Sequence, residues 1–188
     1  YVDPYSGYSF QPEQEVGETF RGLRDINRSL TDIDINSKYF AKAAKTFKTG
    51  RAVYSGRPGV LISARTLKLF TEVVHVHGGY LPDYRGSTTF YFSILAEEYI
   101  GASSIVLNSN IDQGDVIIRQ KFKPISGINI DYVLDPLARA NVLVRTLKKL
   151  FSQKTKDIFI RQDANKGTTY QVIHPILKWK ALKKLNNI

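Results

Sequence analysis

The chain has 188 residues, enough for one domain with a hydrophobic core, and its 43% hydrophobic and 23% charged residues exclude global disorder. Cysteine is absent and no apolar run approaches the roughly 18 residues of a membrane span, which excludes disulfides, zinc–thiolate sites and a transmembrane helix. We therefore expect a cytoplasmic location without a membrane partner. The 27 Lys and Arg against 17 Asp and Glu give a net charge of +10, which favours an anionic partner: nucleic acid, a nucleotide-linked metabolite or a polyglutamylated cofactor.

The polar first segment shows no hydrophobic period, so we expect an irregular arm over residues 1–35. Between residues 36 and 155, strand patterns alternate with helix patterns. We predict a helix from its cap at Asn36 to 48, an amphipathic segment over 63–70, helices over 87–99 and 129–151, and strands over 52–55, 73–77, 103–107 and 115–122. Residues 156–188 are expected to extend the same domain, with strands over 158–160 and 168–172 and a basic helix from Pro175.

Strands that alternate with helices predict an α/β fold over residues 36–155. We expect a Rossmann-like open, mostly parallel sheet with flanking helices. Ligands of such sheets bind beyond the carboxyl ends of the strands, so the segments 75–86 and 110–115 are the candidate functional loops.

Alternation along the strand over 73–77 points His75 and His77 to the same side, roughly 6.6 Å apart at about 3.3 Å per residue. Three interpretations of this pair stay open on the residues alone. A metal would need a third ligand, for which only Asp112 and the distant His174 are candidates. Otherwise the two rings are structural and bonded to backbone carbonyls, or they perform general acid–base work with a carboxylate.

Four short motifs follow one another in the chain: His75-Val76-His77-Gly78-Gly79-Tyr80-Leu81-Pro82, Tyr84-Arg85-Gly86-Ser87, Gly101-Ala102-Ser103 and Ile111-Asp112-Gln113-Gly114-Asp115. In this order and spacing, the stretch from about Arg51 to Phe122 resembles the folate-dependent formyltransferases. Their pattern is Asn-x-His-Pro-Ser-Leu-Leu-Pro, then Tyr-Arg-Gly, Gly-x-Thr and Ile-Asp-Thr-Gly-Asp. The resemblance implies the formyltransferase fold of the methionyl-tRNA and nucleotide-amino-sugar enzymes. We do not find the first strand, glycine turn and helix of that fold before Asn36, so we expect an incomplete N-terminal part.

The resemblance also implies an activity, the transfer of a formyl group from 10-formyltetrahydrofolate to an amine without a metal. His77 stands at the position of the family's catalytic histidine and would stabilise the oxyanion or move the proton. Asp112 stands at the position of the catalytic aspartate and would orient His77. His75 replaces the family's asparagine, so that its ring N–H would donate to the oxyanion as a third catalytic group, and Gly78 replaces the usual proline.

The same resemblance assigns binding residues. The folate pocket is expected to contain Arg57, Pro58, Gly59, Val60, Leu61, Leu81 and Pro82. The substrate is expected to contact Tyr84, Arg85 and Gly86. In this group Arg85 would anchor a phosphate or carboxylate, or else form a structural ion pair.

The expected acceptor is the amine of a nucleotide-linked amino sugar of bacterial surface glycan biosynthesis. The tRNA enzymes carry a further C-terminal β-barrel domain, for which the 66 residues after Phe122 are too few, so nucleic acid is not an expected partner. A homodimer is compatible with this expectation. The alternatives are a catalytically impaired folate- or nucleotide-binding protein, a methionyl-tRNA-type formyltransferase, and a basic RNA-binding module in which Tyr5, Tyr8 and Phe10 stack on bases.

Overall fold

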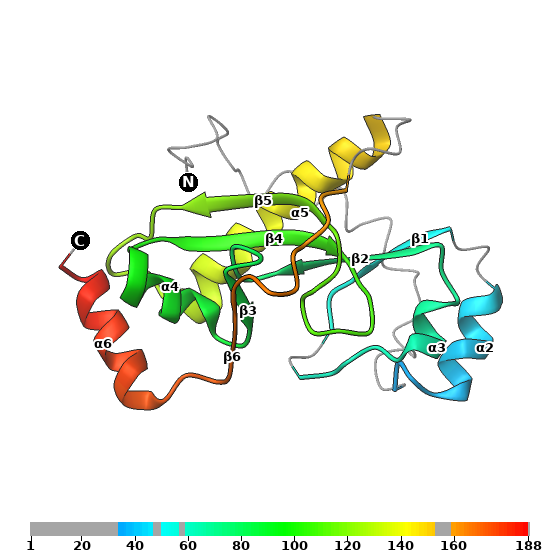
Figure 1. Cartoon of the computed structure of the whole chain (residues 1–188), viewed down its shortest axis with the longest axis horizontal. Coiled ribbons are helices and arrows are strands. Elements are labelled where there is room, and N and C mark those ends of the chain that lie inside the picture. Colours follow the sequence, from blue (N-terminus) through cyan, green and yellow to red (C-terminus); the bar gives the residue numbers. More distant parts are fainter. Residues whose placement is uncertain (1–33, 47–49, 57–58, 153–158, 188) are drawn as a thin grey trace.

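The structure, a computed structural model, describes residues 34–46, 50–56, 59–152 and 159–187 (Figure 1). Its centre is a four-stranded sheet in the spatial order β1 (Arg51–Tyr54), β2 (Glu72–His77), β4 (Ile100–Val106) and β5 (Val116–Phe122). A second sheet has two parallel strands, β3 (Tyr84–Gly86) and β6 (Thr168–Tyr170). Most of the predicted arm, residues 1–33, lies outside the described residues.

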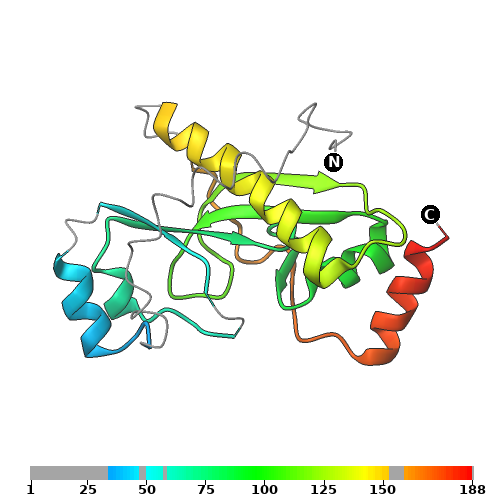
Figure 2. The same ribbon diagram turned by 180° about the vertical axis from the view of Figure 1, so that it is seen from behind.

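Helices lie at both ends of the sheet and across one face. In Figure 1, α2 (Lys38–Thr46) and α3 (Ala64–Leu67) lie at one end of the sheet, and α4 (Thr89–Glu97) and α6 (Pro175–Leu185) lie toward the other. Figure 2 shows α5 (Asp135–Ser152), which follows the short π-helical segment η2 (Ile130–Leu134), crossing the face that is turned away in Figure 1. Every fourth residue of α5 is buried, which is the helical repeat that turns one side toward the sheet: Ala138, Val142, Thr146 and Leu150.

The packing of β2 decides where the candidate site lies. Val76 belongs to the largest core, which it shares with residues of α4, α5 and α6, and Val74 packs with Leu150 of α5. Because side chains alternate along a strand, His75 and His77 point to the opposite face of the sheet from Val74 and Val76. The apolar half of β2 therefore anchors the strand, and the other half is free for polar contacts.

The predicted α/β class with flanking helices is confirmed, but the prediction of mostly parallel strands is wrong for the described sheet. β1 and β2 are parallel, whereas β2 with β4 and β4 with β5 are antiparallel. Only the loop 107–115 joins β4 to β5, and a parallel return needs a crossover of about a dozen residues or more. After α4, Glu98 has a left-handed conformation with a φ of 60° and β4 begins at Ile100, so the chain turns straight back along β2.

The predicted cap of the first helix is wrong by one residue. Ser37 caps α2, because its Oγ accepts the backbone N–H of Phe40 at 3.1 Å. The side chain of Asn36 instead ties this end of α2 to the loop before α3. Its Oδ1 accepts the Ser63 N–H and its Nδ2 donates to the Leu61 carbonyl, both at 2.8 Å.

The C-terminal segment packs onto the elements before it. β6 pairs with β3, and α6 contacts α4. The basic helix α6 begins at Pro175 as predicted, and His174 caps it by accepting the Ile176 N–H on Nδ1 at 3.2 Å. The proposed division into a domain over 36–155 and an extension over 156–188 stays a prediction, and its boundary lies outside the described residues. Among the described residues, no helix has both the length and the apolarity that crossing a membrane requires.

Candidate active site

The two residues predicted to carry the chemistry lie together in the structure. His77 ends β2, and Asp112 lies in the loop 107–115 between β4 and β5. The imidazole Nδ1 of His77 lies 3.4 Å from Oδ2 of Asp112, and the two side chains are only 7% and 13% exposed. The loop leaves β4 opposite Val74, and its contacts with His77 and with the Gly86 N–H hold the carboxylate at the end of β2. A buried histidine–carboxylate pair is suited to hold a positive charge.

Asp112 is fixed by its backbone as well as by its side chain. It has a left-handed conformation with a φ of 52°, which aspartate tolerates better than most residues. Its Oδ2 accepts the Gly86 N–H at 2.8 Å, and its carbonyl accepts the side-chain amide of Gln162 at 2.9 Å. The same amide donates to the Gly114 carbonyl at 2.6 Å. Sequence reasoning missed Gln162, since nothing in its local pattern indicates a contact with a loop about fifty residues earlier.

The ring of His77 has an acceptor at each nitrogen. Nε2 lies 2.9 Å from the carbonyl of Tyr84, which can only accept, so Nε2 carries the hydrogen. Gly79 makes this contact possible, because a Cβ there would lie 2.6 Å from Nε2 and would collide with the same carbonyl. Nδ1 faces Asp112, so only the protonated ring donates on both sides.

His75 lies on the same face of β2 but has a different environment. Its Nδ1 lies 3.0 Å from the carbonyl of Tyr54 in β1, and the two rings are 5.8 Å apart at 44°. Burial lowers the pKa of His75, and the positive charges of His77 and Arg139 lower it further, against the opposing effects of the Tyr54 carbonyl and Asp112. We therefore expect a neutral imidazole at neutral pH.

A second carboxylate beside the site was not predicted. A Cβ on Gly78 would lie only 2.7 Å from Oδ1 of Asp135, so this carboxylate occupies the space that a side chain at position 78 would need. Oδ2 of Asp135 accepts from Arg139 at 2.7 Å, whereas Oδ1 is buried without a partner in the described part of the chain. Burial raises the pKa of Asp135, and the charges of Arg139 and His77 oppose this. The replacement of the family's proline by Gly78 was the only sequence signal for this contact.

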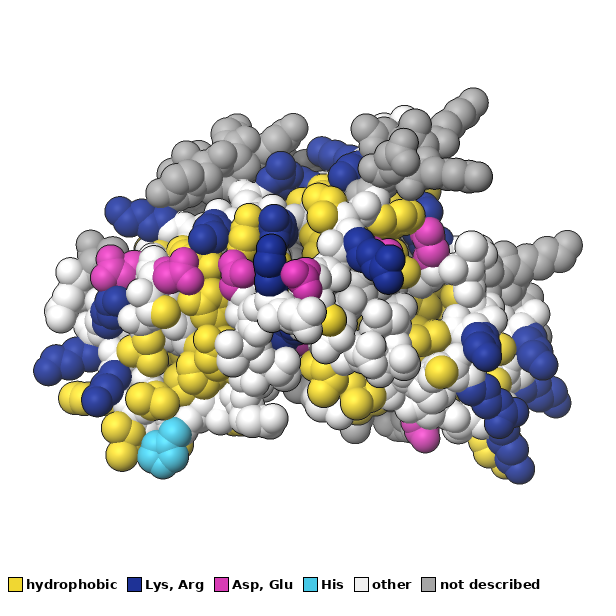
Figure 3. All heavy atoms as spheres, in the orientation of Figure 1, with side chains coloured by type: hydrophobic (Ala, Val, Ile, Leu, Met, Phe, Trp, Pro, Cys, Tyr) yellow, Lys and Arg dark blue, Asp and Glu magenta, His cyan; other side chains and the backbone are white. Residues whose placement is uncertain are grey.

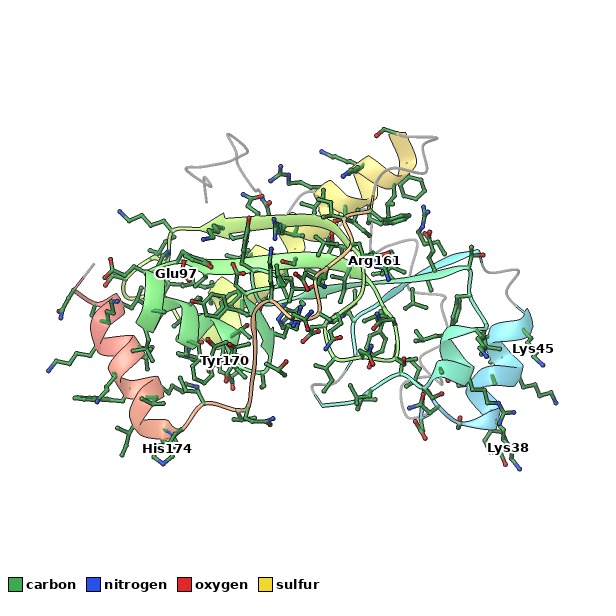
Figure 4. All side chains as sticks on the ribbon, in the orientation of Figure 1. Lys38, Lys45, Glu97, Arg161, Tyr170 and His174 are labelled. Carbon is green, nitrogen blue, oxygen red and sulfur yellow. The ribbon has the colours of Figure 1, made fainter. Side chains whose placement is uncertain are left out.

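The predicted substrate residues are mostly engaged within the protein. Tyr84 is buried, donates its hydroxyl hydrogen to Glu97 at 2.8 Å and stacks on the ring of Tyr170. Figure 4 labels these two partners, Glu97 and Tyr170. Arg85 is 2% exposed, and its two terminal nitrogens donate to backbone carbonyls of residues 163 and 164 at 3.1 and 3.5 Å. Gly86 contributes the N–H that binds Asp112. A direct substrate contact by these three residues stays a prediction.

The predicted folate residues fall into three groups. Arg57 and Pro58 lie outside the described residues. Gly59, Val60 and Leu61 are exposed, the last two by 40% and 62%, so they offer apolar surface to a ligand. Leu81 is fully buried with Ile105 and Val116, and Pro82 is half-buried. The side chain of Leu81 thus packs beneath the surface, and its place in a folate pocket stays a prediction.

The other titratable side chains test the interpretation of a metal site and show where the positive charge lies. Among the described residues, no group of three His, Asp or Glu side chains is arranged to hold a metal. Figure 4 shows His174, once a candidate ligand, at the outer end of α6. Lysine and arginine side chains gather over α2 and α6 in Figure 3, and Lys38 and Lys45 point outward from α2 in Figure 4. Figure 3 also shows lysine and arginine side chains along the upper part of this face, so positive charge is spread over the surface and not confined to one site.

Comparisons with known proteins agree with the motifs. The methionyl-tRNA formyltransferase of Streptococcus uberis is 26% identical over 103 residues, which cover 53% of this chain and 33% of the relative. The corresponding enzyme of Chlorobium chlorochromatii is 28% identical over 123 residues, which cover 62% of this chain and 38% of the relative. The matches thus span little more than a third of these relatives. No protein-family model matches the chain.

Solved structures show the same fold at lower identity. HypX from Aquifex aeolicus aligns with a TM-score of 0.59 and 16% identity over 78% of this chain and 25% of that protein. A 4-N formyltransferase from Francisella tularensis aligns with a TM-score of 0.55 and 19% identity over 81% of this chain and 66% of that protein. Together, the curated relatives and these structures confirm the resemblance to the folate-dependent formyltransferases and show that the described domain has the formyltransferase fold.

Proposed function

We propose that this chain carries the catalytic site of a folate-dependent N-formyltransferase, which transfers the formyl group of 10-formyltetrahydrofolate to an amine. The observation that carries the proposal is the buried contact between His77 and Asp112, which stand at the two catalytic motif positions. A similar HypX structure, with a TM-score of 0.57, was solved with tetrahydrofolic acid, which supports folate as the donor. The donor is a substrate of the reaction, and the proposed chemistry uses side chains alone.

Formyl transfer requires that a negative charge be stabilised. As the amine attacks the formyl carbon, the carbonyl oxygen gains charge, and preorganised positive groups lower the energy of that state. We assign this role to His77 in its cationic form, because the Tyr84 carbonyl lies 2.9 Å from Nε2 and Oδ2 of Asp112 lies 3.4 Å from Nδ1. Asp112 stabilises the cation and fixes the plane of the ring.

The donor pocket is proposed on the exposed side of the loop before α3. Val60 and Leu61 present apolar side chains there, beside Gly59, and Asn36 holds the loop through the Leu61 carbonyl. An apolar surface with few polar contacts suits a flat heterocycle such as the pterin ring. Pro82, together with Arg57, Pro58 and Leu81, completes the set that the motifs assign to this pocket.

The proposed acceptor is the amine of a nucleotide-linked amino sugar, as in the surface glycans of bacteria. Alignment with the Francisella tularensis 4-N formyltransferase covers 81% of this chain, and a sugar N-formyltransferase from Shewanella aligns to the same extent with a TM-score of 0.57. The net charge of +10 would attract the diphosphate of such a substrate. A homodimer is part of the same proposal.

A second candidate function is formylation of methionyl-tRNA. It is favoured by the curated relatives, all four of which are methionyl-tRNA formyltransferases. The two functions share the chemistry at His77 and Asp112 and differ in the acceptor. They are separated by salt dependence, because binding to a nucleic acid weakens steeply as salt rises.

The test begins with calorimetric titration of the full chain with 5-formyltetrahydrofolate, a stable analogue of the donor. Formyl transfer is then measured with dTDP-, UDP- and GDP-linked amino sugars and, separately, with methionyl-tRNA. His77→Gln should lower kcat by about 100- to 10,000-fold while folate binding persists. His174→Gln is the matched control, because this histidine only caps α6, and it should leave kcat unchanged. A chain that binds no folate and transfers no formyl group would contradict the proposed function.

A further inference from the structure

The hydrogen bond of His75 fixes which of its ring nitrogens carries a proton. Nδ1 lies 3.0 Å from the Tyr54 carbonyl, and a carbonyl oxygen only accepts, so Nδ1 is the donor. In a neutral imidazole the other nitrogen, Nε2, then has a free lone pair. The amide of an asparagine would donate a hydrogen bond from this position, whereas neutral His75 accepts one. The expectation that His75 simply replaces the amide donor therefore disagrees with the geometry.

The surroundings keep this ring neutral. His75 is half-buried, and burial is the main cause that lowers its pKa. The charged groups that act on it come from three elements: His77 of β2 and Arg139 of α5 lower the pKa, and Asp112 of the loop 107–115 raises it, as does the carbonyl of Tyr54 in β1. Protonation of Nε2 is thus disfavoured in the resting state, and the lone pair is available at neutral pH.

The His75 ring lies on the same face of the sheet as the proposed reaction. His75 and His77 are two residues apart on β2, so both side chains leave the same face, opposite to Val74 and Val76. The Tyr54 ring packs against His75 at 5.8 Å and holds its plane. Nε2 has no hydrogen-bond partner among the residues that the structure describes, so a ligand can use it.

We propose that His75 is the general base of the transfer, an inference that rests on the proposed function. As the amine nitrogen bonds to the formyl carbon, the carbonyl π pair moves onto oxygen, and Nε2 of His75 takes the proton that the nitrogen loses. When the oxyanion re-forms the carbonyl, the bond from the formyl carbon to folate N10 breaks and its electron pair stays on N10. Nε2 then returns the proton to N10, so the ring ends the cycle neutral and no further reactant is needed.

In this proposal the two histidines have different roles, one in stabilising charge and the other in transferring the proton. His77, with the Tyr84 carbonyl at Nε2 and Asp112 beside Nδ1, supplies positive charge to the oxyanion. His75, with a donor bond at Nδ1 only, moves the proton. An asparagine at position 75 has no basic lone pair, so it would leave the site without its proton acceptor.

The first test needs no acceptor. Long-range ¹H–¹⁵N correlation spectra of the full chain, assigned with His75→Asn and recorded with and without 5-formyltetrahydrofolate, report the protonation of each ring nitrogen. At neutral pH we expect His75 to carry its hydrogen on Nδ1 and to lack one on Nε2. A hydrogen on Nε2, in either a neutral or a doubly protonated ring, would overturn the inference whatever the activity.

The second test uses turnover with the amino-sugar acceptor that proves active. His75→Asn should lower kcat by at least about 100-fold and remove the ionisation of His75 from the acid limb of the pH profile, with folate affinity within about twofold. In His75→Ala, added imidazole should restore part of the lost kcat, because a free base can enter the vacated space. If His75→Asn retains kcat, or imidazole restores nothing, His75 is not the base, although formyl transfer itself stands. If the wild-type chain neither binds folate nor transfers formyl, the proposed function fails and this inference fails with it.

Discussion

Replacing Gly78 by alanine tests the packing beside His77. Gly78 is not one of the glycines with a positive φ, so alanine can adopt its backbone conformation. Without a collision, alanine would stabilise the fold by about 0.4–1 kcal/mol, because it lowers the conformational entropy of the unfolded chain. The new Cβ, however, would lie 2.7 Å from Oδ1 of Asp135 and 3.4 Å from Cε1 of Phe90. Overpacking of this kind costs about 1–3 kcal/mol. We therefore expect Gly78→Ala to lower the free energy of unfolding by about 1–2 kcal/mol.

A double-mutant cycle measured by urea unfolding isolates the cause. With Asp135→Ala the carboxylate is gone, so the double variant should be more stable than the sum of the single effects predicts, by about 1 kcal/mol. Gly50→Ala is the control, because a Cβ there meets nothing within 4 Å and should not destabilise the protein. Additive effects of Gly78→Ala and Asp135→Ala would show that the new Cβ does not collide with the Asp135 carboxylate.

Three further substitutions test the hydrogen bonds and the burial that hold the residues of the site in place. Ser103→Ala should lower the free energy of unfolding by about 2 kcal/mol, because the buried hydroxyl donates to the Gly79 carbonyl at 2.7 Å and accepts the Leu81 N–H at 3.0 Å; an unchanged urea midpoint would contradict this. Gln162→Ala should lower kcat about tenfold with folate affinity unchanged, since its amide holds the Asp112 carbonyl, and a wild-type kcat would count against that role. The pKa of His75 is lower in the folded state than its value of 6.5 in the unfolded chain, because burial disfavours the charged ring. The folded state therefore has its full stability above pH 6.5 and loses stability as the pH falls toward the folded-state pKa, because the unfolded chain binds the proton more readily. Wild type should thus lose more urea stability than His75→Asn between about pH 7 and pH 5, and equal losses would contradict the burial of this ring.

The features that the sequence predicted correctly depend on local patterns or on motif order. Proline at position 175 suits only the first turn of a helix, and α6 begins there. The apolar run before His77 indicates a buried strand, and β2 covers it. The resemblance implied that His77 and Asp112 lie in one site, and the structure places Nδ1 and Oδ2 3.4 Å apart, whereas their catalytic roles stay a prediction.

The features that the sequence did not predict depend on contacts between distant segments. Gln162 and Asp135 reach the site through chain packing, and neither residue type is unusual for its local element. Strand direction depends on how a connection turns, and here the left-handed Glu98 sends β4 back along β2. Ser37 caps α2, and the side chain of Asn36 is instead bonded to the loop before α3, a contact between segments about 25 residues apart.

The most direct test of the account is single-turnover formyl transfer by the wild-type chain and by His77→Gln, with 10-formyltetrahydrofolate and a panel of nucleotide-linked amino sugars. Both proteins are first shown to be folded and to bind 5-formyltetrahydrofolate. We expect the wild type to formylate at least one amino sugar, and His77→Gln to transfer the formyl group about 100-fold or more slowly. Formyl transfer that is equally fast in both proteins would show that the contact between His77 and Asp112 is not the catalytic centre.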